Sequence, residues 1–269
     1  MADALKSIDL MPVLFVGHGS PMNAIEDNEF VQGWRDTVKE IPKPTAILCV
    51  SAHWETNGTA VTAMAKPPTI HDFGGFPRAL YEVQYPAPGS PELAKQVKTI
   101  MTKTNVRLDD SWGLDHGCWS VLRVMYPKAD IPIVQVSLDY SDDASRHYDL
   151  ARELASLREK GVLIVGSGNM VHNLRMVDWD NLEKPGYGHE WATEANEMMK
   201  KLILADDHKS LTDYKSLGKA FDLAIPTPEH FLPLLYVLAL KKEDDRVSFF
   251  NDKLVGGSLS MTSVKIGKA

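Results

Sequence analysis

The sequence is short of cysteine, of basic charge and of long apolar runs. The two cysteines, Cys49 and Cys118, form no CxxC pair, so we expect free buried thiols, which suit a reducing cytoplasm. The net charge of −7 argues against a nucleic-acid partner, because a general nucleic-acid binder would show a basic face. No stretch approaches the about 20 apolar residues of a membrane span, so no membrane partner is expected.

The amino-terminal segment MADALKSIDL is too polar and too short to form the apolar core of a secretion signal. We therefore expect a cytoplasmic protein. The length of 269 residues, with 44% hydrophobic and 24% charged residues, is ordinary for a globular chain and suits one large α/β unit better than two. We predict a single domain over residues 1–269.

Four short apolar runs predict buried strands. They cover residues 11–16 (MPVLFV), 46–51 (AILCVS), 131–137 (IPIVQVS) and 162–165 (VLIV). Each run is bounded by turn residues and is rich in β-branched side chains. Because the runs are continuously apolar and do not alternate with polar residues, both faces of these strands should be covered.

Helical patterns fall between the apolar runs, at residues 91–102, 145–160, 190–204 and 228–240. The last is expected to have Thr227 as its cap and Pro228 in its first position. Strands that alternate with helices predict an α/β fold with a mostly parallel central sheet flanked by helices. Two β-rich runs within residues 247–266 flank a Val-Gly-Gly turn and predict a hairpin at the sheet edge.

Histidines follow three of the predicted strands. His18 lies in GHGSP after the first strand, His53 follows the second, and His172 lies in GSGNMVHN after the fourth. In an open α/β sheet, ligands bind beyond the carboxyl ends of the strands. Three histidines at equivalent topological positions therefore indicate a shared site, and imidazole is the commonest ligand for zinc and iron.

Three further histidines are candidates for the same site. His230 should open a helix, where the helix dipole would lower its pKa and keep it neutral. His116 lies between two tryptophans beside Asp115, a carboxylate that would orient it if the side chains can meet; the alternative is a packed surface loop. His71 begins the glycine- and aromatic-rich segment 71–77, which suits a mobile lid over a flat ligand; the alternative is an ordinary turn. No role is assigned to three others, namely His147, His189 and His208.

Two common motifs are excluded by their details. GHGSP is not a G-x-S-x-G nucleophile elbow, because Ser20 is displaced by one position and Pro21 replaces the closing glycine. GSGN after the fourth strand lacks the third glycine and the lysine of a phosphate-binding loop, so a nucleotide site is not expected.

Six segments, spread from residue 16 to residue 235, together resemble a known family. They are VGHGSP, SAHWET, HDFGGFP, LDHGCW, GSGNMVHNL and TPEHFLPLL. In this order they are similar to the signature segments of the 4,5-DOPA extradiol dioxygenase branch of the class III extradiol ring-cleaving dioxygenases. The resemblance implies a single catalytic domain that opens a DOPA-like catechol with O₂ to a muconic semialdehyde, with the catechol and O₂ as small-molecule partners.

The resemblance also implies a set of functional residues. His18, His53 and His230 match metal-binding positions, and His172 matches a histidine counted either as a fourth ligand or as the catalytic acid/base. Extradiol enzymes commonly use two histidines and a carboxylate, so either Glu229 or His230 could point at the metal. His116 is expected to support His172 in catalysis. The residues expected to bind substrate are His71, Phe73 and Trp119.

The identity of the metal and the reaction stay open at this point. Ring cleavage needs Fe(II), with three protein ligands on one face and open positions for the substrate, whereas a three-histidine site would also suit zinc. One alternative is a zinc-dependent hydrolase of the same shape. Another is a non-catalytic protein that binds a metal or a small molecule. A monomer or a small homo-oligomer is expected.

Overall fold

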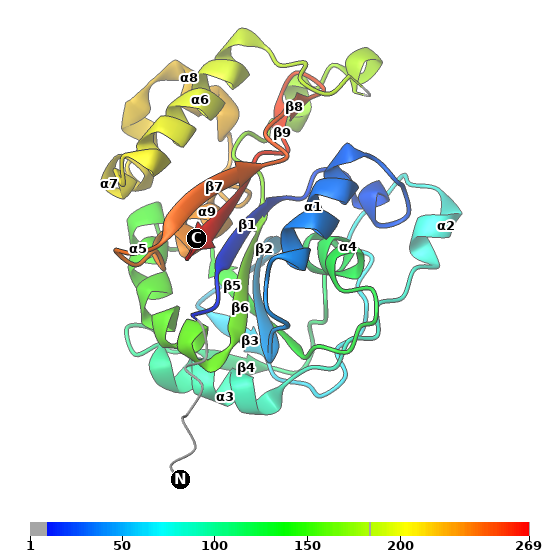
Figure 1. Ribbon diagram of the computed structural model, residues 1–269, viewed down its shortest axis with the longest axis vertical. Coiled ribbons are helices and arrows are strands. Elements are labelled where there is room, and N and C mark those ends of the chain that lie inside the picture. Colours follow the sequence, from blue (N-terminus) through cyan, green and yellow to red (C-terminus); the bar gives the residue numbers. More distant parts are fainter. Residues whose placement is uncertain (1–9, 183, 269) are drawn as a thin grey trace.

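An eight-stranded sheet in the order β4-β3-β5-β2-β6-β1-β10-β7 lies at the centre of the protein, with helices on both faces (Figure 1). The computed structural model describes residues 10–182 and 184–268. Most of the MADALKSIDL segment therefore lies outside the described residues. The α/β architecture expected from the sequence is confirmed.

The four strands expected from the apolar runs form the parallel centre of this sheet. They are β1 (Val13–Gly17), β2 (Ala46–Thr56), β5 (Ile133–Asp139) and β6 (Val162–Gly168). Strand β6 pairs in parallel with β1 and with β2, and β2 pairs in parallel with β5. Pairing continues as far as Gly17 beside Gly168, so the GSG segment expected after the strand belongs to it.

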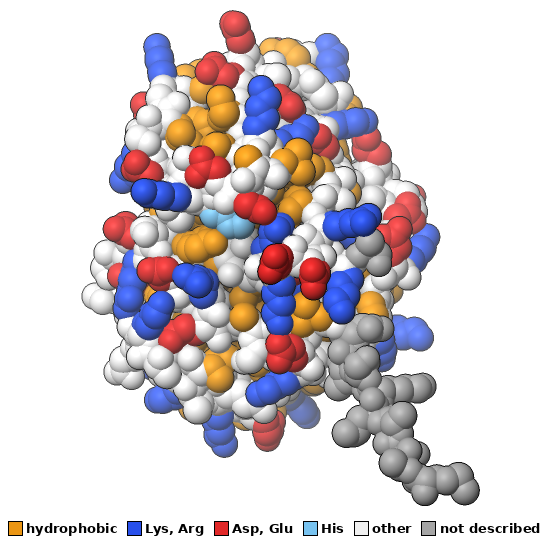
Figure 2. All heavy atoms as spheres, turned by 60° about the vertical axis from the view of Figure 1, so that its left-hand side comes forward, with side chains coloured by type: hydrophobic (Ala, Val, Ile, Leu, Met, Phe, Trp, Pro, Cys, Tyr) orange, Lys and Arg blue, Asp and Glu red, His pale blue; other side chains and the backbone are white. Residues whose placement is uncertain are grey.

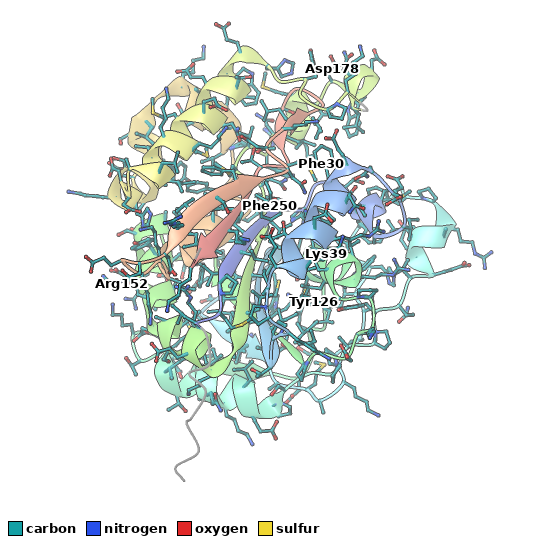
Figure 3. The ribbon with its side chains drawn as sticks, viewed as in Figure 1. Phe30, Lys39, Tyr126, Arg152, Asp178 and Phe250 are labelled. Atoms are coloured by element: carbon teal, nitrogen blue, oxygen red, sulfur yellow. The ribbon has the colours of Figure 1, made fainter. Side chains whose placement is uncertain are left out.

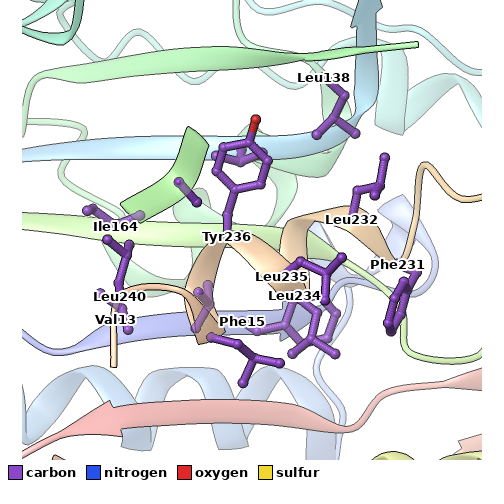
Figure 4. Packing of buried hydrophobic residues seen from close by; sticks show 14 of the residues in the cluster. Val13, Phe15, Leu138, Ile164, Phe231, Leu232, Leu234, Leu235, Tyr236 and Leu240 are labelled. Atoms are coloured by element: carbon purple, nitrogen blue, oxygen red, sulfur yellow. The ribbon is translucent and has the colours of Figure 1, made fainter. Parts of the chain in front are cut away.

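Neighbouring side chains on one strand enter two different cores. In β1, Val13 and Phe15 belong to one buried cluster, while Leu14 and Val16 belong to the other. The first cluster lies under α3 (Pro91–Ile100), α5 (Ala144–Ala151) and α9 (Leu232–Leu238), and Figure 4 shows its packing around α9. The second lies under α1 (Glu29–Lys39) and α4 (His116–Met125). Because both faces are covered, apolar residues can occupy successive positions of a strand, as they do in β1.

The remaining elements complete the chain. They are η1 (Pro21–Ala24), β3 (Ala60–Thr62), α2 (Arg78–Tyr81), β4 (Arg107–Asp109), η2 (Arg152–Lys160), η3 (Leu174–Met176), η4 (Trp179–Asn181), α6 (Glu190–Leu204), α7 (His208–Thr212), η5 (Tyr214–Leu217), α8 (Lys219–Ala224), β7 (Arg246–Phe250), β8 (Leu254–Val255), β9 (Leu259–Ser260) and β10 (Ser263–Gly267). The sequence patterns did not predict the helices α1, α2, α4, α7 and α8 or the strands β3 and β4.

The helices expected at residues 91–102 and 190–204 are present as α3 and α6. The one expected at residues 145–160 is α5 followed by the 3₁₀ segment η2, which ends at Gly161. The prediction for residues 228–240 was wrong at its start. Helix α9 begins only at Leu232, after a turn in which the backbone N–H groups of Phe231 and Leu232 both donate to the Pro228 carbonyl. Thr227 does not cap the helix, because its hydroxyl donates to Glu229.

The carboxyl-terminal hairpin is confirmed in a more elaborate form. Strand β7 is the sheet edge and pairs antiparallel with β10, which pairs antiparallel with β1. Between β7 and β10, β8 and β9 form a small two-stranded sheet around the Gly256–Gly257 turn. Figure 3 labels Phe30 on α1 and Phe250 at the end of β7, and both residues pack in the cluster on the α1 face.

A buried ion pair joins elements near the amino ends of the central strands. The side chains of Arg158 and Asp245 are 0% and 1% exposed, and their closest nitrogen and oxygen are 2.6 Å apart. Arg158 also donates to the carbonyls of Met11 (2.7 Å) and Leu240 (2.6 Å). The pair therefore connects η2, the segment before β1, the end of the α9 region and the approach to β7.

The surface carries both signs of charge. Figure 2 shows acidic and basic side chains interspersed over one face, around an area where histidine atoms reach the surface. Across the part of the chain that is described, no helix is both long and apolar enough to cross a bilayer.

Candidate metal centre

Five histidines gather at the carboxyl end of the sheet. His18 directly follows β1, His53 lies within the last part of β2, and His172 follows β6. His230 comes from the turn before α9, and His116 is the first residue of α4. The rule that ligands bind beyond the carboxyl ends of parallel strands therefore located the site from the sequence.

Two glycines allow the site-bearing segments to approach one another. A Cβ on Gly168 would lie 2.1 Å from the His230 carbonyl oxygen, and a Cβ on Gly117 would lie 2.5 Å from the Ser51 hydroxyl. The His230 turn is joined to the end of β6, since Asn169 donates its backbone N–H to the His230 carbonyl at 2.8 Å. Larger residues at either glycine would separate segments that carry ligands.

His18, His53 and His230 offer nitrogens that all lie within 4.8 Å of one another. The Nε2 atoms of His18 and His53 are 3.3 Å apart. Two nitrogens bound at about 2.0–2.1 Å to one ion lie roughly 2.8–3.4 Å apart when their angle is between octahedral and tetrahedral. The donor set therefore fits a divalent transition metal.

Hydrogen bonds fix the tautomers of two of these imidazoles. The Ser167 hydroxyl donates to the Gly117 carbonyl at 2.6 Å, so its oxygen accepts from Nδ1 of His18 at 3.1 Å. Glu229 accepts from Nδ1 of His230 at 3.0 Å. In both rings the Nε2 lone pair is left free for a metal, as in the carboxylate–histidine–metal arrangement of many sites. Glu229 thus orients His230, and His230 points its nitrogen at the other two histidines.

Burial keeps these imidazoles neutral. It lowers the pKa of His53 to about 3 and holds the pKa of His18 and His230 well below the usual range, and neighbouring histidines add to the effect. A metal ligand must be neutral, so the site is ready to bind an ion at neutral pH. His230 does not open a helix as expected, because α9 begins two residues after it, and the causes of its lowered pKa are burial and the neighbouring histidines.

His172 lies beside this set in a different orientation. Its ring stacks on that of His230, with centroids 3.5 Å apart and planes inclined by 7°. Imidazole lone pairs lie in the ring plane, so two parallel rings cannot both direct a nitrogen at the same ion. Burial lowers the pKa of His172 to about 4, although Glu229 opposes this.

His116 is only 7% exposed, so it does not lie in a packed surface loop. The carboxylate that orients it is Asp72, and not Asp115: Asp72 accepts from the His116 ring at 2.9 Å and from its backbone N–H at 2.8 Å. Asp115 instead caps α4 through the Cys118 N–H and accepts from Ser51 at 2.7 Å. Burial raises the pKa of Asp115.

The segment 71–77 and Trp119 lie next to His116. The Phe73 ring meets the His116 ring edge-on at 5.5 Å, and His71 lies 5.6 Å from Trp119. Trp119 is fully buried, and its indole N–H donates to the Ile70 carbonyl at 2.7 Å. It therefore holds the chain directly before the segment 71–77. Phe73 is half-buried and closer to the histidine cluster.

Three residues that shape the site were not assigned a role from the sequence. Asp72, Ser167 and Ser51 each lie within, or directly beside, a motif that was singled out for its histidine. The available signal for Asp72 was its position directly after His71, and the signal for Ser167 was its place at the end of a predicted strand. Their pairing partners are distant in sequence, so the motifs could not identify them.

Comparisons with known proteins agree with this geometry. The family model described as the catalytic LigB subunit of aromatic ring-opening dioxygenase matches residues 12–264. The chain is 48% identical to a 4,5-DOPA dioxygenase extradiol of Escherichia coli (strain K12), with 98% of each protein covered. It is 35% identical to the 4,5-DOPA dioxygenase extradiol of Beta vulgaris, over 96% of this chain and 97% of that one.

A solved structure shows the same fold. The crystal structure of an uncharacterized protein from Escherichia coli K12 matches with a TM-score of 0.82 at 44% sequence identity, covering 96% of this chain and 100% of that chain. The family model extends over all three histidines whose nitrogens converge. The chain therefore belongs to the LigB family and is an extradiol aromatic ring-opening dioxygenase.

Proposed function

We propose that this enzyme opens the ring of a DOPA-like catechol with O₂, giving a muconic semialdehyde. The observation that carries the proposal is the convergence of His18, His53 and His230, with two of their Nε2 atoms 3.3 Å apart. The substrate class comes from the relatives, since the similar proteins of Escherichia coli and Beta vulgaris are 4,5-DOPA dioxygenases.

These three histidines would hold Fe(II). When bound, iron supplies Lewis acidity toward the catechol hydroxyls and redox chemistry toward O₂. A three-histidine set on one side of an ion leaves positions for a bidentate substrate. Zinc would also fit the donor set, but it has no redox chemistry, so a zinc-loaded protein should bind catechols without opening them.

His172 is the proposed acid/base of the reaction. Its stacking on His230 places it beside the ligand set without directing a lone pair at the same ion. Its lowered pKa leaves it neutral at neutral pH, so it can take a proton from a catechol hydroxyl and return it later in the cycle. His116 would support it from its place beside His53, since the two ring centroids are 3.8 Å apart.

Phe73 is the proposed contact for the flat face of the substrate ring. It is held edge-on to His116 at 5.5 Å, where an aromatic ring can pack against a catechol. His71 and Trp119 would act by holding the segment 71–77 in place, because His71 meets the Val83 carbonyl at 3.0 Å and Trp119 is buried beneath it.

The test is anaerobic reconstitution with Fe(II), followed by oxygen-uptake measurements on a panel of catechols. We expect one O₂ consumed per ring opened, and DOPA-like catechols should be among the best substrates. Oxygen uptake with simple catechols and none with DOPA would overturn the substrate class. The zinc-loaded protein serves as the control and should consume no oxygen.

The zinc-dependent hydrolase considered from the sequence is not retained, because the match to the ring-opening dioxygenase family covers residues 12–264. The suitability of three histidines for zinc concerns which metal binds, and not which reaction the enzyme performs.

A further inference from the structure

Both carboxylate oxygens of Asp72 lie within hydrogen-bond distance of His116. Asp72 accepts from the His116 backbone N–H at 2.8 Å through one oxygen and meets Nδ1 of the ring at 2.9 Å through the other. The side chains of His116 and Asp72 are 9% and 16% exposed. An ionised carboxylate only accepts hydrogen bonds, so the proton of the neutral imidazole must be on Nδ1, and Nε2 carries a lone pair.

The free nitrogen of His116 lies next to the ligand set. The His116 ring is 3.8 Å from that of His53 and 6.0 Å from that of His18, measured between centroids. Over residues 10–182 and 184–268, Nε2 of His116 makes no hydrogen bond and is not among the polar atoms sealed from solvent without a partner. It is therefore reached by solvent.

We infer that Asp72 is a positioning residue that holds His116 in the Nδ1–H tautomer, so that Nε2 accepts a hydrogen bond from a ring hydroxyl of the substrate. His116 thereby selects aromatic substrates that carry a hydroxyl donor at this position. The inference rests on the proposed catechol function. His116 also lies in a second group of potential ligands, with His53 and Asp72, but there the Asp72 carboxylate is already paired with the His116 ring. The group of His18, His53 and His230 can therefore hold the ion without His116.

The chain segment around Asp72 is held independently of its carboxylate. The Ile70 N–H donates to the Leu114 carbonyl at 2.7 Å, and the Trp119 indole donates to the Ile70 carbonyl at the same distance. His71 is held at the Val83 carbonyl. Removing the charge of Asp72 should therefore leave the segment in place.

The variant Asp72→Asn can change the tautomer of the His116 ring while it keeps the hydrogen bond to the His116 backbone. Its amide oxygen can still accept from the His116 backbone N–H, but its NH₂ group can only donate to the ring. The ring would then keep a lone pair on Nδ1 and carry its proton on Nε2. The acceptor facing the substrate would become a donor.

The experiment uses zinc-loaded protein with ¹⁵N-labelled histidine, because zinc is diamagnetic. Long-range ¹H–¹⁵N spectra report the tautomer of each ring, and His116 is assigned by comparison with His116→Gln. We expect Nδ1–H in the wild type and Nε2–H in Asp72→Asn. Catechol affinity, measured by calorimetry on the same samples, should fall about 5- to 100-fold in the variant, because a polar pair has been mismatched. Zinc content should be unchanged.

Asp143→Asn is the matched control, because Asp143 only caps α5 through the Arg146 N–H. It should change neither the His116 tautomer nor catechol affinity. An Nε2–H tautomer in the wild type would overturn the inference even if Asp72→Asn fails to fold. An inverted tautomer with unchanged catechol affinity would overturn the role of His116. A wild type that binds no catechol at all would instead refute the proposed function, and the tautomer result would still stand.

Discussion

Buried polar groups lie at both ends of the central strands, but they are charged at one end and neutral at the other. Near the amino ends, Arg158 and Asp245 are buried as a charged pair with matched hydrogen bonds. At the carboxyl ends, burial instead lowers the pKa of His18, His53 and His230, so the same loss of water leaves neutral groups with free lone pairs. The first arrangement is satisfied within the chain, whereas the second leaves lone pairs that a bound ion would use under the proposed function.

Because of this difference, we expect residues at the amino ends to stabilise the fold and residues at the carboxyl ends to serve the chemistry. Removing one partner of a buried ion pair leaves an uncompensated charge and destabilises the fold. Removing one buried neutral imidazole removes a ligand but leaves no stranded charge. Mutations at the amino ends should therefore act on folding, and those at the carboxyl ends should act on metal binding and catalysis.

The largest effect is expected for His53→Ala. The variant loses the central member of the ligand set, so it should retain no stoichiometric iron after dialysis and should show no oxygen uptake with catechols. The melting temperature of the metal-free protein should change little. His189→Ala is the control, since His189 contacts the Met176 carbonyl away from the cluster. Full iron retention in His53→Ala would contradict the three-histidine site.

His172→Ala should follow in size. General acid–base catalysis typically contributes about 10²–10⁴-fold, so kcat should fall by that factor while iron content stays stoichiometric. Catechol affinity should fall much less than kcat. The measurements are iron content, catechol affinity and oxygen uptake on one sample. Loss of the metal itself would make His172 a required ligand and would contradict the orientation inferred from its stacking on His230.

Arg158→Ala should have the largest effect at the other end of the strands. Breaking a buried pair typically costs about 3–5 kcal/mol of unfolding free energy, which urea denaturation of the metal-free protein would measure. The folded fraction should bind iron with wild-type affinity. The double variant Arg158→Met/Asp245→Leu removes both charges and should recover much of the loss. If Arg158→Ala kept the wild-type free energy of unfolding but bound iron more weakly, the assignment of this end of the strands to stability would be wrong.

Glu229→Gln should have a smaller effect at the metal end. Glu229 orients His230 through Nδ1, and losing such a partner typically weakens metal affinity about 10- to 100-fold. Titration with a competing chelator would measure this change. Equal affinities in the variant and the wild type would show that the His230 turn is held by its backbone contacts alone.

The smallest effect is expected when the pH is lowered and the free energy of unfolding is measured. Burial raises the pKa of Asp245, but hydrogen bonds from Arg158 and from the Lys242 backbone lower it more, so it lies below its ordinary value. The unfolded chain therefore binds this proton more readily, and the stabilisation is present above the unfolded pKa of about 3.9 and lost as the pH falls through the folded pKa. Urea unfolding from pH 6 down to pH 3 should show this loss, and Asp245→Asn should flatten the curve.

The parallel centre of the sheet and three strand-exit histidines were predictable because they depend on local pattern. Continuous apolar runs mark strands covered on both faces, and one topological rule then locates their carboxyl ends. Helix α9 was placed too early because Thr227 and Pro228 form a good start signal, and the turn that competes with it is held by contacts from β6. Propensity does not include such contacts.

The partners of the site histidines could not be predicted, since they are tertiary. Asp72 reaches His116 across 44 positions, and Ser167 reaches His18 across 149. The adjacent carboxylate Asp115 was the natural candidate for orienting His116, but its side chain is already used by Ser51, Gln135 and the start of α4. Only the arrangement of all these segments shows which carboxylate is available.

The converging ligands come from opposite ends of the chain, since His18 directly follows β1 and His230 directly precedes α9. During synthesis, a ribosome-bound chain that ends before residue 230 cannot form the complete ligand set. Contacts between residues so far apart in sequence form late, because the entropy of closing a long loop must be overcome first. Iron loading should therefore follow folding in time, and a metal that binds only the native state will shift the folding equilibrium toward it.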